Sequence, residues 1–425
     1  MGHFIEQKLR TPIVGAYDVI VVGSGPSGFS SAVSAARKGV RVLLIESGSC
    51  VGGMSTSGLM SHFTGDVDSR LYQEILDRAY QKNISKKEDK TRIDPELLKN
   101  TYLEMLTESG VELLLYTFVC DVIMDNERVK GVITESKSGR CAYLSEVVID
   151  CTGDGDVAYY TGAEFVLGRE SDHKMQPATL MFKVGGVDMA RAVLPPSFET
   201  TVETPKGELQ ELAKKHLPFP AGHVLLYSSP IPGIVTVNMT NAIGINGTKA
   251  EDMTKAELQC RSQMGPIVAF LREYVPGFES CYIISAASQI GIRETRHFAG
   301  VEKITEQDIL EAHVFDNWIV RGARFEFDVH NMTGASLDKT GVQKEFPQKK
   351  GYTIPYGCII PKEINGLLLS GRNISGTHLA HASFRSMPIC VAIGEACGIA
   401  AALAVKGHTD LRNVDPHEVQ ACLVR

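Results

Sequence analysis

The 425-residue chain is 44% hydrophobic and carries a formal net charge of -7 at pH 7. This length predicts two or three lobes with a large core. The acidic balance, with no basic stripe along the chain, argues against a nucleic-acid partner. No stretch approaches the ~20 unbroken apolar residues that a membrane span needs, so we expect no membrane partner either.

Cysteine usage indicates a reducing compartment. The chain has 10 cysteines but no C-x-x-C pair, which disfavours a dithiol redox centre, a thiolate-bound metal and an iron–sulfur cluster. Several cysteines lie in apolar runs, where free thiols behave as small hydrophobic residues. The first residues lack the basic region and apolar core of a secretory signal. We therefore expect a cytoplasmic protein.

Residues 17–46 carry the first strong motif, YDVIVVGSGPSGFSSAVSAARKGVRVLLIE. An apolar run of strand length leads into Gly23, Gly25 and Gly28, which complete the pattern G-x-G-x-x-G. These glycines suit a tight turn, close approach of the backbone to a pyrophosphate, and tight packing of a helix on a strand. Glu46 ends the second strand, where it can accept hydrogen bonds from a ribose diol. The stretch predicts a dinucleotide-binding unit; an α/β unit with a merely tight turn is the alternative.

The stretch that follows favours FAD over NAD. The pair Gly52–Gly53 lets the backbone lie close to a flat ligand. Residues 112–135 read as three strands of an antiparallel insert, and EVVIDCTGDGD at 146–156 reads as a further buried strand with a glycine-rich turn. A simple NAD domain would alternate more helices with its strands.

The pattern changes again in the second half of the chain. Residues 165–345 are richer in Pro, Met and short alternating runs, with helical stretches between them. One of these, TEQDILEAHVF, opens with a capping-box spacing from Thr305 to Asp308. We expect this part to form an α+β substrate or cap domain.

The chain then returns to the first pattern. GLLLSGRNISG at 366–376 reads as a third buried strand, and MPICVAIGEACGIAAALAVKG at 387–407 as a small-residue helix. We therefore predict an α/β fold whose Rossmann-like FAD-binding domain is split in sequence, over 14–164 and 346–425, by the substrate domain at 165–345.

These motifs together resemble the FAD-dependent oxidoreductase family of bacterial flavoproteins, of the glutathione-reductase-like superfamily that also holds the fumarate reductase flavoproteins. The resemblance runs from about residue 17 to 407. It implies a bound FAD and redox chemistry at a carbon centre, and it names no substrate. The matching stretches are VVGSGPSGFSSAVSAARKGVRVLLIE, VGGMSTSGL, VVIDCTGDGDVAYYTGAEF, IGIRETRHFAG, FDVHN and GLLLSGRNISGTHLAHASFRSMPICVAIGEACGIAAALA.

The residues expected to hold FAD non-covalently belong to the glycine motifs and to the turns that follow the buried strands. Cys50 could attach the flavin covalently, but a buried thiol is the expected state, and His62 is expected to border the flavin. The predicted cofactor residues are Gly23, Gly25, Pro26, Ser27, Gly28, Glu46, Ser47, Gly52, Gly53, Met54, Val119, Thr152, Gly153, Gly371, Arg372 and Met387.

A direct hydride transfer between flavin N5 and a substrate carbon needs an acid–base group and cationic groups beside that carbon. The segment GTHLAHASFRSMP at 376–388 precedes a helix whose positive end suits the flavin N1 edge. We expect His378 or His381 to be the acid–base group and Arg385 to orient substrate or stabilise reduced flavin. The alternatives are a histidine that only hydrogen-bonds the backbone and an arginine paired with a structural carboxylate.

The motif GIRETR supplies a further cation. Arg293 is the expected active-site residue, while an internal network of Glu294 with Arg296 is expected to be structural. In FEFDVHN, the alternation places Glu326, Asp328 and His330 on one face. Three such side chains could ligate a metal, but without a corroborating ligand we expect a hydrogen-bonded network and no metal.

Two classes of function follow from these residues. The first is a flavin-dependent dehydrogenase or reductase that oxidises CH–OH or CH–NH, or reduces an activated C=C, in a small polar metabolite. The second is a non-redox flavoprotein that uses FAD or NAD structurally or as a reactant. The sequence leaves open the substrate, the direction, the electron acceptor, the use of NAD(P)H as reductant and the oligomeric state.

Overall fold

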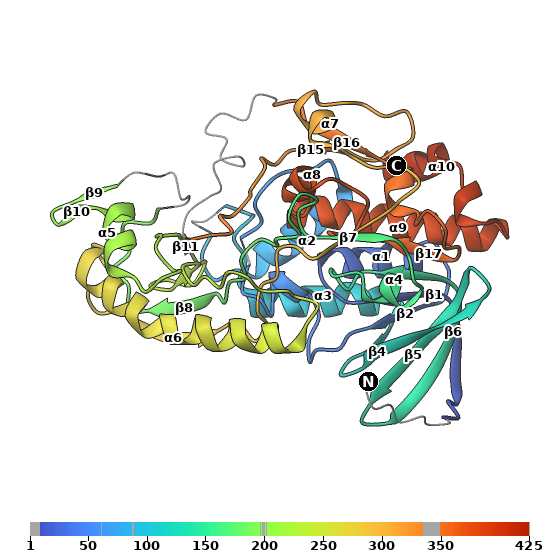
Figure 1. The fold of residues 1–425 in the computed structure, drawn as a ribbon, viewed down its shortest axis with the longest axis horizontal. Helices are drawn as coiled ribbons and strands as arrows, with labels where there is room; N and C mark the ends of the chain where they lie inside the picture. Colours follow the sequence, from blue (N-terminus) through green and yellow to red (C-terminus); the bar gives the residue numbers. More distant parts are fainter. Residues whose placement is uncertain are drawn as a thin grey trace.

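The computed structural model describes residues 9–424, apart from 61, 87–88, 196, 198–199, 201 and 335–348. The two ends of the chain contribute to one large α/β unit, and the middle contributes a smaller sheet with helices. Figure 1 shows the large unit with α1, α9 and the strands β1–β6, and the smaller one with α5, α6 and β8 beside it.

The parallel sheet begins at β1 (Ile13–Val22), which pairs with β2 (Val42–Ile45) on one side. All four residues of β2 and the last four of β1 are buried, as strands covered on both faces require. The helix α1 (Pro26–Arg37) joins them, with Pro26 in its first turn, where the missing N–H costs no hydrogen bond. β3 (Glu112–Leu114) extends the sheet beyond β2, after α2 (Arg70–Lys82) and α3 (Pro95–Glu108).

The other side of β1 carries the antiparallel insert. β4 (Phe118–Asp125), β5 (Arg128–Ser136) and β6 (Gly139–Asp150) form a meander, and β6 runs on as a parallel neighbour of β1. The insert predicted over 112–135 is therefore present from β4 onwards, whereas its first predicted strand, β3, belongs to the parallel part. The sheet order is β3-β2-β1-β6-β5-β4, with β17 also paired to β6.

The C-terminal segment completes this unit. β17 (Leu367–Leu369) lies parallel to β6, and α9 (Met387–Gly407) packs against α1, beside which it is drawn in Figure 1. The two helix backbones are very close, because a Cβ added at Gly398 would overlap the carbonyl oxygen of Ser31. Only glycine allows this approach.

The middle of the chain has its own hydrophobic core, made by residues from Ala178 to Ile290. Its sheet has the order β11-β12-β8-β13 and is accompanied by α5 and the 25-residue helix α6. The elements are β8 (Phe182–Gly185), β9 (Glu203–Thr204), β10 (Gly207–Glu208), α5 (Leu209–His216), β11 (Leu226–Ser228), β12 (Val235–Val237), α6 (Ala250–Tyr274) and β13 (Tyr282–Ala286).

This second core covers less of the chain than the substrate domain predicted at 165–345, whose limit at 345 lies outside the described residues. Residues Phe298 to Met332 pack in the core of the large unit, because β14 pairs with β7 and β15 pairs with β16. The amino-acid composition did not indicate that this segment rejoins the large unit, because short strands have similar sequence patterns in both units. The remaining elements are α4 (Asp156–Tyr160), β7 (Phe165–Leu167), β14 (Arg296–Phe298), α7 (Glu306–Leu310), β15 (Trp318–Ala323), β16 (Tyr352–Pro355), α8 (His378–Phe384) and α10 (Pro416–Val424), with short 3₁₀ turns at Gly53–Ser55, Tyr356–Ile359 and Leu411–Asn413.

Some of the local features predicted from the sequence are present in the structure. The capping box predicted from Thr305 to Asp308 is present at the start of α7, with both reciprocal hydrogen bonds. FEFDVHN has no regular strand structure, because the chain leaves β15 at Ala323, yet the three residues predicted to share a face, Glu326, Asp328 and His330, all line one cavity. The segment that carries the two candidate histidines forms a short helix, α8 (His378–Phe384).

We predict that Gly398→Ala lowers the free energy of unfolding by about 1–3 kcal/mol, because the added methyl group must separate α9 from α1. Gly265→Ala is the control, since Gly265 also lies within a helix but a Cβ there meets nothing within 4 Å. It should change the free energy of unfolding by less than about 1 kcal/mol. Urea unfolding followed by circular dichroism measures both, and equal effects would contradict this account of the α1–α9 contact.

Candidate active site

A cleft opens at the carboxyl ends of the parallel strands β1, β2, β6 and β17, where ligands bind in open α/β sheets. Its floor is the turn from β1 into α1. A Cβ at Gly28 would overlap the carbonyl oxygen of Gly23, so the third glycine serves the packing of helix on strand. Gly25 meets nothing within 4 Å on its Cβ side and leaves the cleft open to a ligand.

Glu46 is fixed at the rim of this cleft by the loops around it. One carboxylate oxygen accepts hydrogen bonds from the Ser24 backbone N–H at 2.9 Å and from the Ser24 hydroxyl at 2.5 Å. The other accepts from the backbone N–H of Gly48 at 2.6 Å. The side chain is thereby held in one orientation, with the spacing from the glycine turn that a ribose diol requires.

Most of the predicted cofactor residues line this cleft. Gly28 and Gly52 do not: Gly28 faces the strand, and Gly52 faces Thr56 and Tyr102. The lining residues that were predicted are Gly23, Gly25, Pro26, Ser27, Glu46, Ser47, Gly53, Met54, Val119, Thr152, Gly153, Gly371, Arg372 and Met387.

Sequence reasoning missed several lining residues. The neighbours of predicted positions, such as Ser24 and Ser370, could have been found by extending each motif by one residue. Gln289 comes from the end of the middle segment, and no local signal marks it. Arg385, predicted to orient substrate or stabilise reduced flavin, also lines the cleft, and the lining residues that were not predicted are Val22, Ser24, Ile45, Thr117, Phe118, Cys151, Asp156, Gln289, Ser370 and Cys390.

A second cavity adjoins the cleft, and the two share Met54, Arg372, Arg385 and Met387. The second core supplies one wall and the large unit the other. The remaining lining residues are Met60, Thr64, Thr179, Met181, Ser197, Leu225, Tyr227, Asn238, Gly291, Ile292, Arg293, Phe325, Glu326, Asp328, His330 and Ser386.

Arg293 lines this second cavity, as expected of an active-site residue. Its guanidinium donates to the carbonyl oxygen of Pro177 at 2.5 Å and to the hydroxyl of Thr179 at 2.8 Å. Both acceptors are neutral, and Asp328 in the same cavity is the nearby carboxylate that acts on the positive charge. Burial, and then the nearby charge of Arg385, lower the pKa of Arg293 to about 10.

Arg385 stands at the junction of the two cavities. It donates to the carbonyl oxygen of Asp328 at 2.7 Å and to the Asp328 carboxylate at 3.0 Å. Arg385 therefore pairs with a carboxylate, which was the predicted alternative to a role in the active site. Its side chain nevertheless also lines both cavities. Its Nε is buried without a hydrogen-bond partner among the described residues.

His330 and Asp328 form the hydrogen-bonded network predicted for FEFDVHN, with Nε2 of His330 3.3 Å from the Asp328 carboxylate. Burial raises the pKa of Asp328, but His330 and Arg385 more than offset this, so the pKa lies well below its usual range. Burial and the charge of Arg293 lower the pKa of His330 to about 4. At neutral pH, His330 is therefore a neutral imidazole beside a carboxylate.

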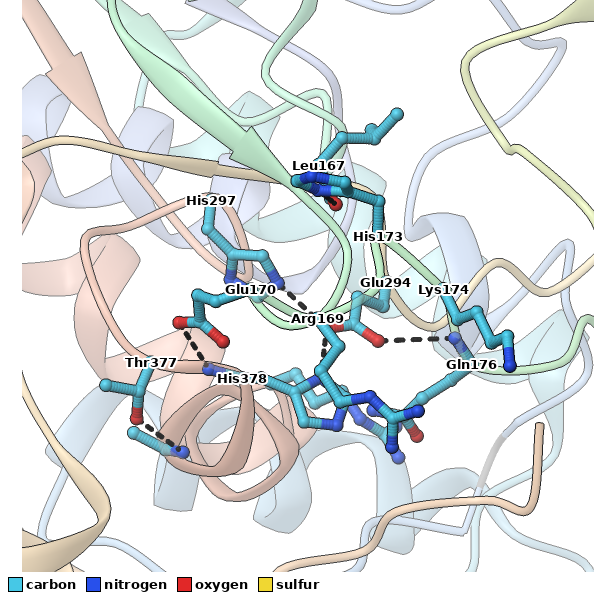
Figure 2. Close-up of polar contacts among 12 residues, drawn as sticks. Leu167, Arg169, Glu170, His173, Lys174, Gln176, Glu294, His297, Thr377 and His378 are labelled. Carbon is cyan, nitrogen blue, oxygen red and sulfur yellow. Dashed lines mark hydrogen bonds and ion pairs between the residues drawn. The ribbon is translucent and has the colours of Figure 1, made fainter.

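His378 and His381 do not line either cavity, so the prediction that they face the flavin is wrong. Helix formation at 378–384 turns both side chains toward the middle of the fold, where they are buried near Glu294. Nδ1 of His378 lies 2.6 Å from the Glu294 carboxylate, as Figure 2 shows. Burial, and then the neighbouring His297, lower the pKa of His381 well below its usual range.

The expected network of Glu294 with Arg296 is also wrong. Arg296 instead donates to the Asp154 carbonyl oxygen at 2.8 Å and to the Asp156 carboxylate at 2.9 Å. Asp154 also accepts from Arg372 at 2.6 Å, which fixes that arginine at the edge of the cleft. The aspartates of the glycine-rich turn after β6 thus bond both to Arg296 of the GIRETR segment and to Arg372 in the turn after β17.

Two further expectations concerned the region after β2. His62 lies against Tyr227, with ring centroids 5.0 Å apart, and does not line the cleft. Cys50 does not line it either; its sulfur is 3.2 Å from the Ser57 hydroxyl. The structure thus places neither residue against a flavin in this cleft.

The residues present fit an FAD. The glycine turn leaves room for a pyrophosphate and Glu46 suits a ribose. The buried Nε of Arg372 has no hydrogen-bond partner among the described residues, and the first turn of α9 opens on the cleft at Met387 and Cys390. Of the described helices, α9 is also long and apolar enough to cross a membrane, but 89% of that stretch is buried in the fold, as in a core helix.

We predict that Glu46→Ala weakens FAD binding at least about tenfold, because a hydrogen bond to a charged group contributes about 1.5–3 kcal/mol. Quenching of FAD fluorescence on titration into apoprotein measures the affinity. Glu112→Ala is the control, since Glu112 is an exposed carboxylate on the neighbouring strand β3. An unchanged affinity in Glu46→Ala would remove Glu46 from the cofactor site.

Comparison with known proteins agrees with this fit. The chain is 37% identical over 117 residues to a thiamine thiazole synthase of Aeropyrum pernix, covering 27% of this chain and 43% of that protein. It is 24% identical over 196 residues to digeranylgeranylglycerophospholipid reductase 1 of Methanococcoides burtonii, covering 41% of this chain and 46% of that protein. The chain therefore spans only about half the length of these curated relatives.

Among solved structures, a geranylgeranyl bacteriochlorophyll reductase-like protein of Thermoplasma acidophilum superposes with a TM-score of 0.51 at 15% identity, over 96% of this chain and 83% of that chain. The p-nitrophenol 4-monooxygenase PnpA of Pseudomonas putida superposes with a TM-score of 0.50 at 12% identity, over 95% and 84%. These likenesses show the fold alone. The sequence pattern of one family spans residues 18–423, and the chain belongs to that family, the FAD dependent oxidoreductases.

Proposed function

We propose that this flavoenzyme oxidises or reduces a small metabolite that carries an anionic group, such as a carboxylate. When bound, FAD supplies a hydride acceptor or donor at flavin N5, for oxidation of CH–OH or CH–NH or reduction of an activated C=C. The residues of the second cavity bind and orient the metabolite and move its proton.

Arg293 carries the proposal. Its guanidinium is partly buried in the cavity wall, its two hydrogen-bond acceptors are neutral oxygens, and it forms no ion pair among the described residues, although Asp328 lies near enough to partly offset the lowering of its pKa. A second guanidinium, Arg385, lies close enough to lower the pKa of the first. Arg385 is already paired with Asp328, whereas the hydrogen bonds of Arg293 go to neutral oxygens, so an anionic ligand in the cavity can accept charge-assisted hydrogen bonds from Arg293 and from the unpartnered Nε of Arg385.

His330 is the proposed acid–base group, in place of the histidines of α8. It is neutral at pH 7 because its pKa is about 4, so it can accept the proton of a substrate hydroxyl or amine as the hydride leaves the same carbon. Asp328 lies 3.3 Å from Nε2 and can stabilise the imidazolium that forms. In the reverse direction, the same group returns the proton.

The position of the second cavity supports direct transfer. It meets the cofactor cleft at Met54, Arg372, Arg385 and Met387. Arg372 and the first turn of α9 can hold the pyrimidine side of a flavin, because both place positive charge or dipole there. These shared residues would hold the flavin end of the cofactor, and the hydride chemistry that the flavin supplies would then be available to a metabolite bound in the adjoining cavity.

The remaining expectations stay proposals: non-covalent attachment of the FAD, kinship with the glutathione-reductase-like superfamily, NAD(P)H as reductant, and a cytoplasmic location. The alternative function is a non-redox flavoprotein that uses FAD or NAD structurally or as a reactant. The partial similarity to thiamine thiazole synthases supports this non-redox alternative. Flavin reduction by a small substrate under anaerobic conditions would decide between the two.

We predict that anionic substrates bleach the bound flavin and that their methyl esters or amides do so poorly. Arg293→Gln should raise the concentration for half-maximal bleaching about tenfold or more, since a charge-assisted hydrogen bond is lost. Arg321→Gln, which removes an exposed guanidinium outside both cavities, is the control. Equal bleaching by an acid and its ester would refute the anionic substrate.

We predict that His330→Gln slows flavin reduction by roughly 10²–10⁴ while FAD stays bound. In the wild type, the rate of substrate oxidation should fall as the pH drops through about 4, because the protonated imidazole cannot accept a proton. Rapid-mixing absorbance at the flavin band measures the rate. An unchanged rate in His330→Gln, with full flavin content, would exclude His330 as the base.

A further inference from the structure

A buried cluster of Glu294, His297, His378 and His381 lies outside both cavities. Its members come from the GIRETR segment and from α8. The Glu294 side chain is fully buried, and the three histidines are each at most 5% exposed. No step of the proposed reaction uses these groups, although a buried carboxylate ringed by imidazoles is costly to assemble.

The hydrogen bonds within the cluster converge on Glu294. One carboxylate oxygen lies 2.8 Å from Nε2 of His297 and 2.6 Å from Nδ1 of His378, and the other accepts from the Gln176 backbone N–H at 3.2 Å. Figure 2 shows the three groups around the carboxylate. Among the described residues, no lysine or arginine forms an ion pair with Glu294.

Two imidazole nitrogens in the cluster are left over. Nδ1 of His297 and Nδ1 of His381 are buried and have no hydrogen-bond partner among the described residues. The two rings lie edge to face with centroids 4.7 Å apart. Nε2 of His297 is on the Glu294 side of its ring, so it is this nitrogen, in place of its hydrogen bond to the carboxylate, that can share an ion with Glu294. The buried Nδ1 of His381 is thus without a hydrogen-bond partner among the described residues, and a bound ion would satisfy it.

We propose that Glu294, His297 and His381 bind one divalent transition-metal ion of the Zn²⁺ type. Each residue offers one ligand atom, and these atoms lie within 4.8 Å of one another. Two imidazoles and a carboxylate are a donor set that suits Zn²⁺ and its neighbours. His378, hydrogen-bonded to Glu294, orients the carboxylate from outside the ligand set. The cysteines and FEFDVHN, where the sequence raised the question of a metal, take no part.

The place of the ion in the fold gives it a positioning role. Glu294 directly follows Arg293, and α8 ends at Phe384, directly before Arg385. An ion shared by Glu294 and His381 cross-links the two segments that carry these arginines. Occupancy of the site therefore stabilises the geometry of the second cavity while the ion stays out of the chemistry. The binding proposal itself does not depend on the reaction assigned to the enzyme.

The experiment uses the tag-free, full-length, FAD-loaded protein, stripped with a chelator and then dialysed against Zn²⁺. Elemental analysis should give about one Zn²⁺ per chain, and Zn²⁺ should raise the Tm of the stripped protein. His297→Gln and His381→Gln should each weaken Zn²⁺ binding at least about tenfold. His417→Gln, which changes an exposed histidine far along the chain, is the control and should bind as the wild type does.

Two further measurements keep the proposal falsifiable if a variant folds poorly. FAD content reports whether each variant is folded, and X-ray absorption at the zinc edge of the wild-type protein counts the ligands. Two imidazoles with oxygen ligands support the site. Three results would each overturn the proposal. They are sulfur ligands in the absorption spectrum, a zinc content no higher than that of a protein without metal sites, and unchanged Zn²⁺ binding in both histidine variants when these are well folded.

Discussion

The close contact of α1 with α9 is the constraint on which the rest of the structure depends. Gly394 and Gly398 let the C-terminal helix lie directly on the backbone of α1 at Ser27 and Ser31. This contact brings the last strand and helix to the glycine turn near the N-terminus. The cofactor cleft depends on this contact, since the turns after β1 and β17 meet where the hydroxyls of Ser27 and Ser370 are 2.5 Å apart, and both turns line the cleft.

A second set of constraints is electrostatic. Asp154 and Asp156, in the turn after β6, hold Arg372 and Arg296, while Asp328 holds Arg385. These cations are compensated by nearby carboxylates, whereas the hydrogen bonds of Arg293 go to neutral oxygens. These partly buried carboxylates thus fix the arginines around the cleft, whereas Arg293 forms no ion pair among the described residues in the cavity beside it, which is the arrangement expected where an anionic ligand binds.

The histidines of α8 show how a motif can be recognised and its role still misread. Their position after a glycine-ended strand is typical of residues beside a flavin, and Arg385 does reach the cavities. Yet one helical turn directs His378 and His381 to Glu294 instead. We therefore propose His330 as the acid–base group, although only a hydrogen-bonded network was predicted for its segment from the sequence.

The sequence by itself determined the local features whose physics is local: the strand–glycine–helix turn ending at Glu46, the insert after β3, the capping box of α7 and the small-residue helix α9. Family membership follows from the same motifs. Only the tertiary structure decided which residues meet across long separations, such as Gln289 at the cleft, Glu294 with His378, and Arg293 in a cavity next to Arg385. The spacing of residues along the chain determines which of them share a face of a strand or helix. Which other element that face contacts depends on how distant elements pack, and this packing decided which titratable groups line the cavities.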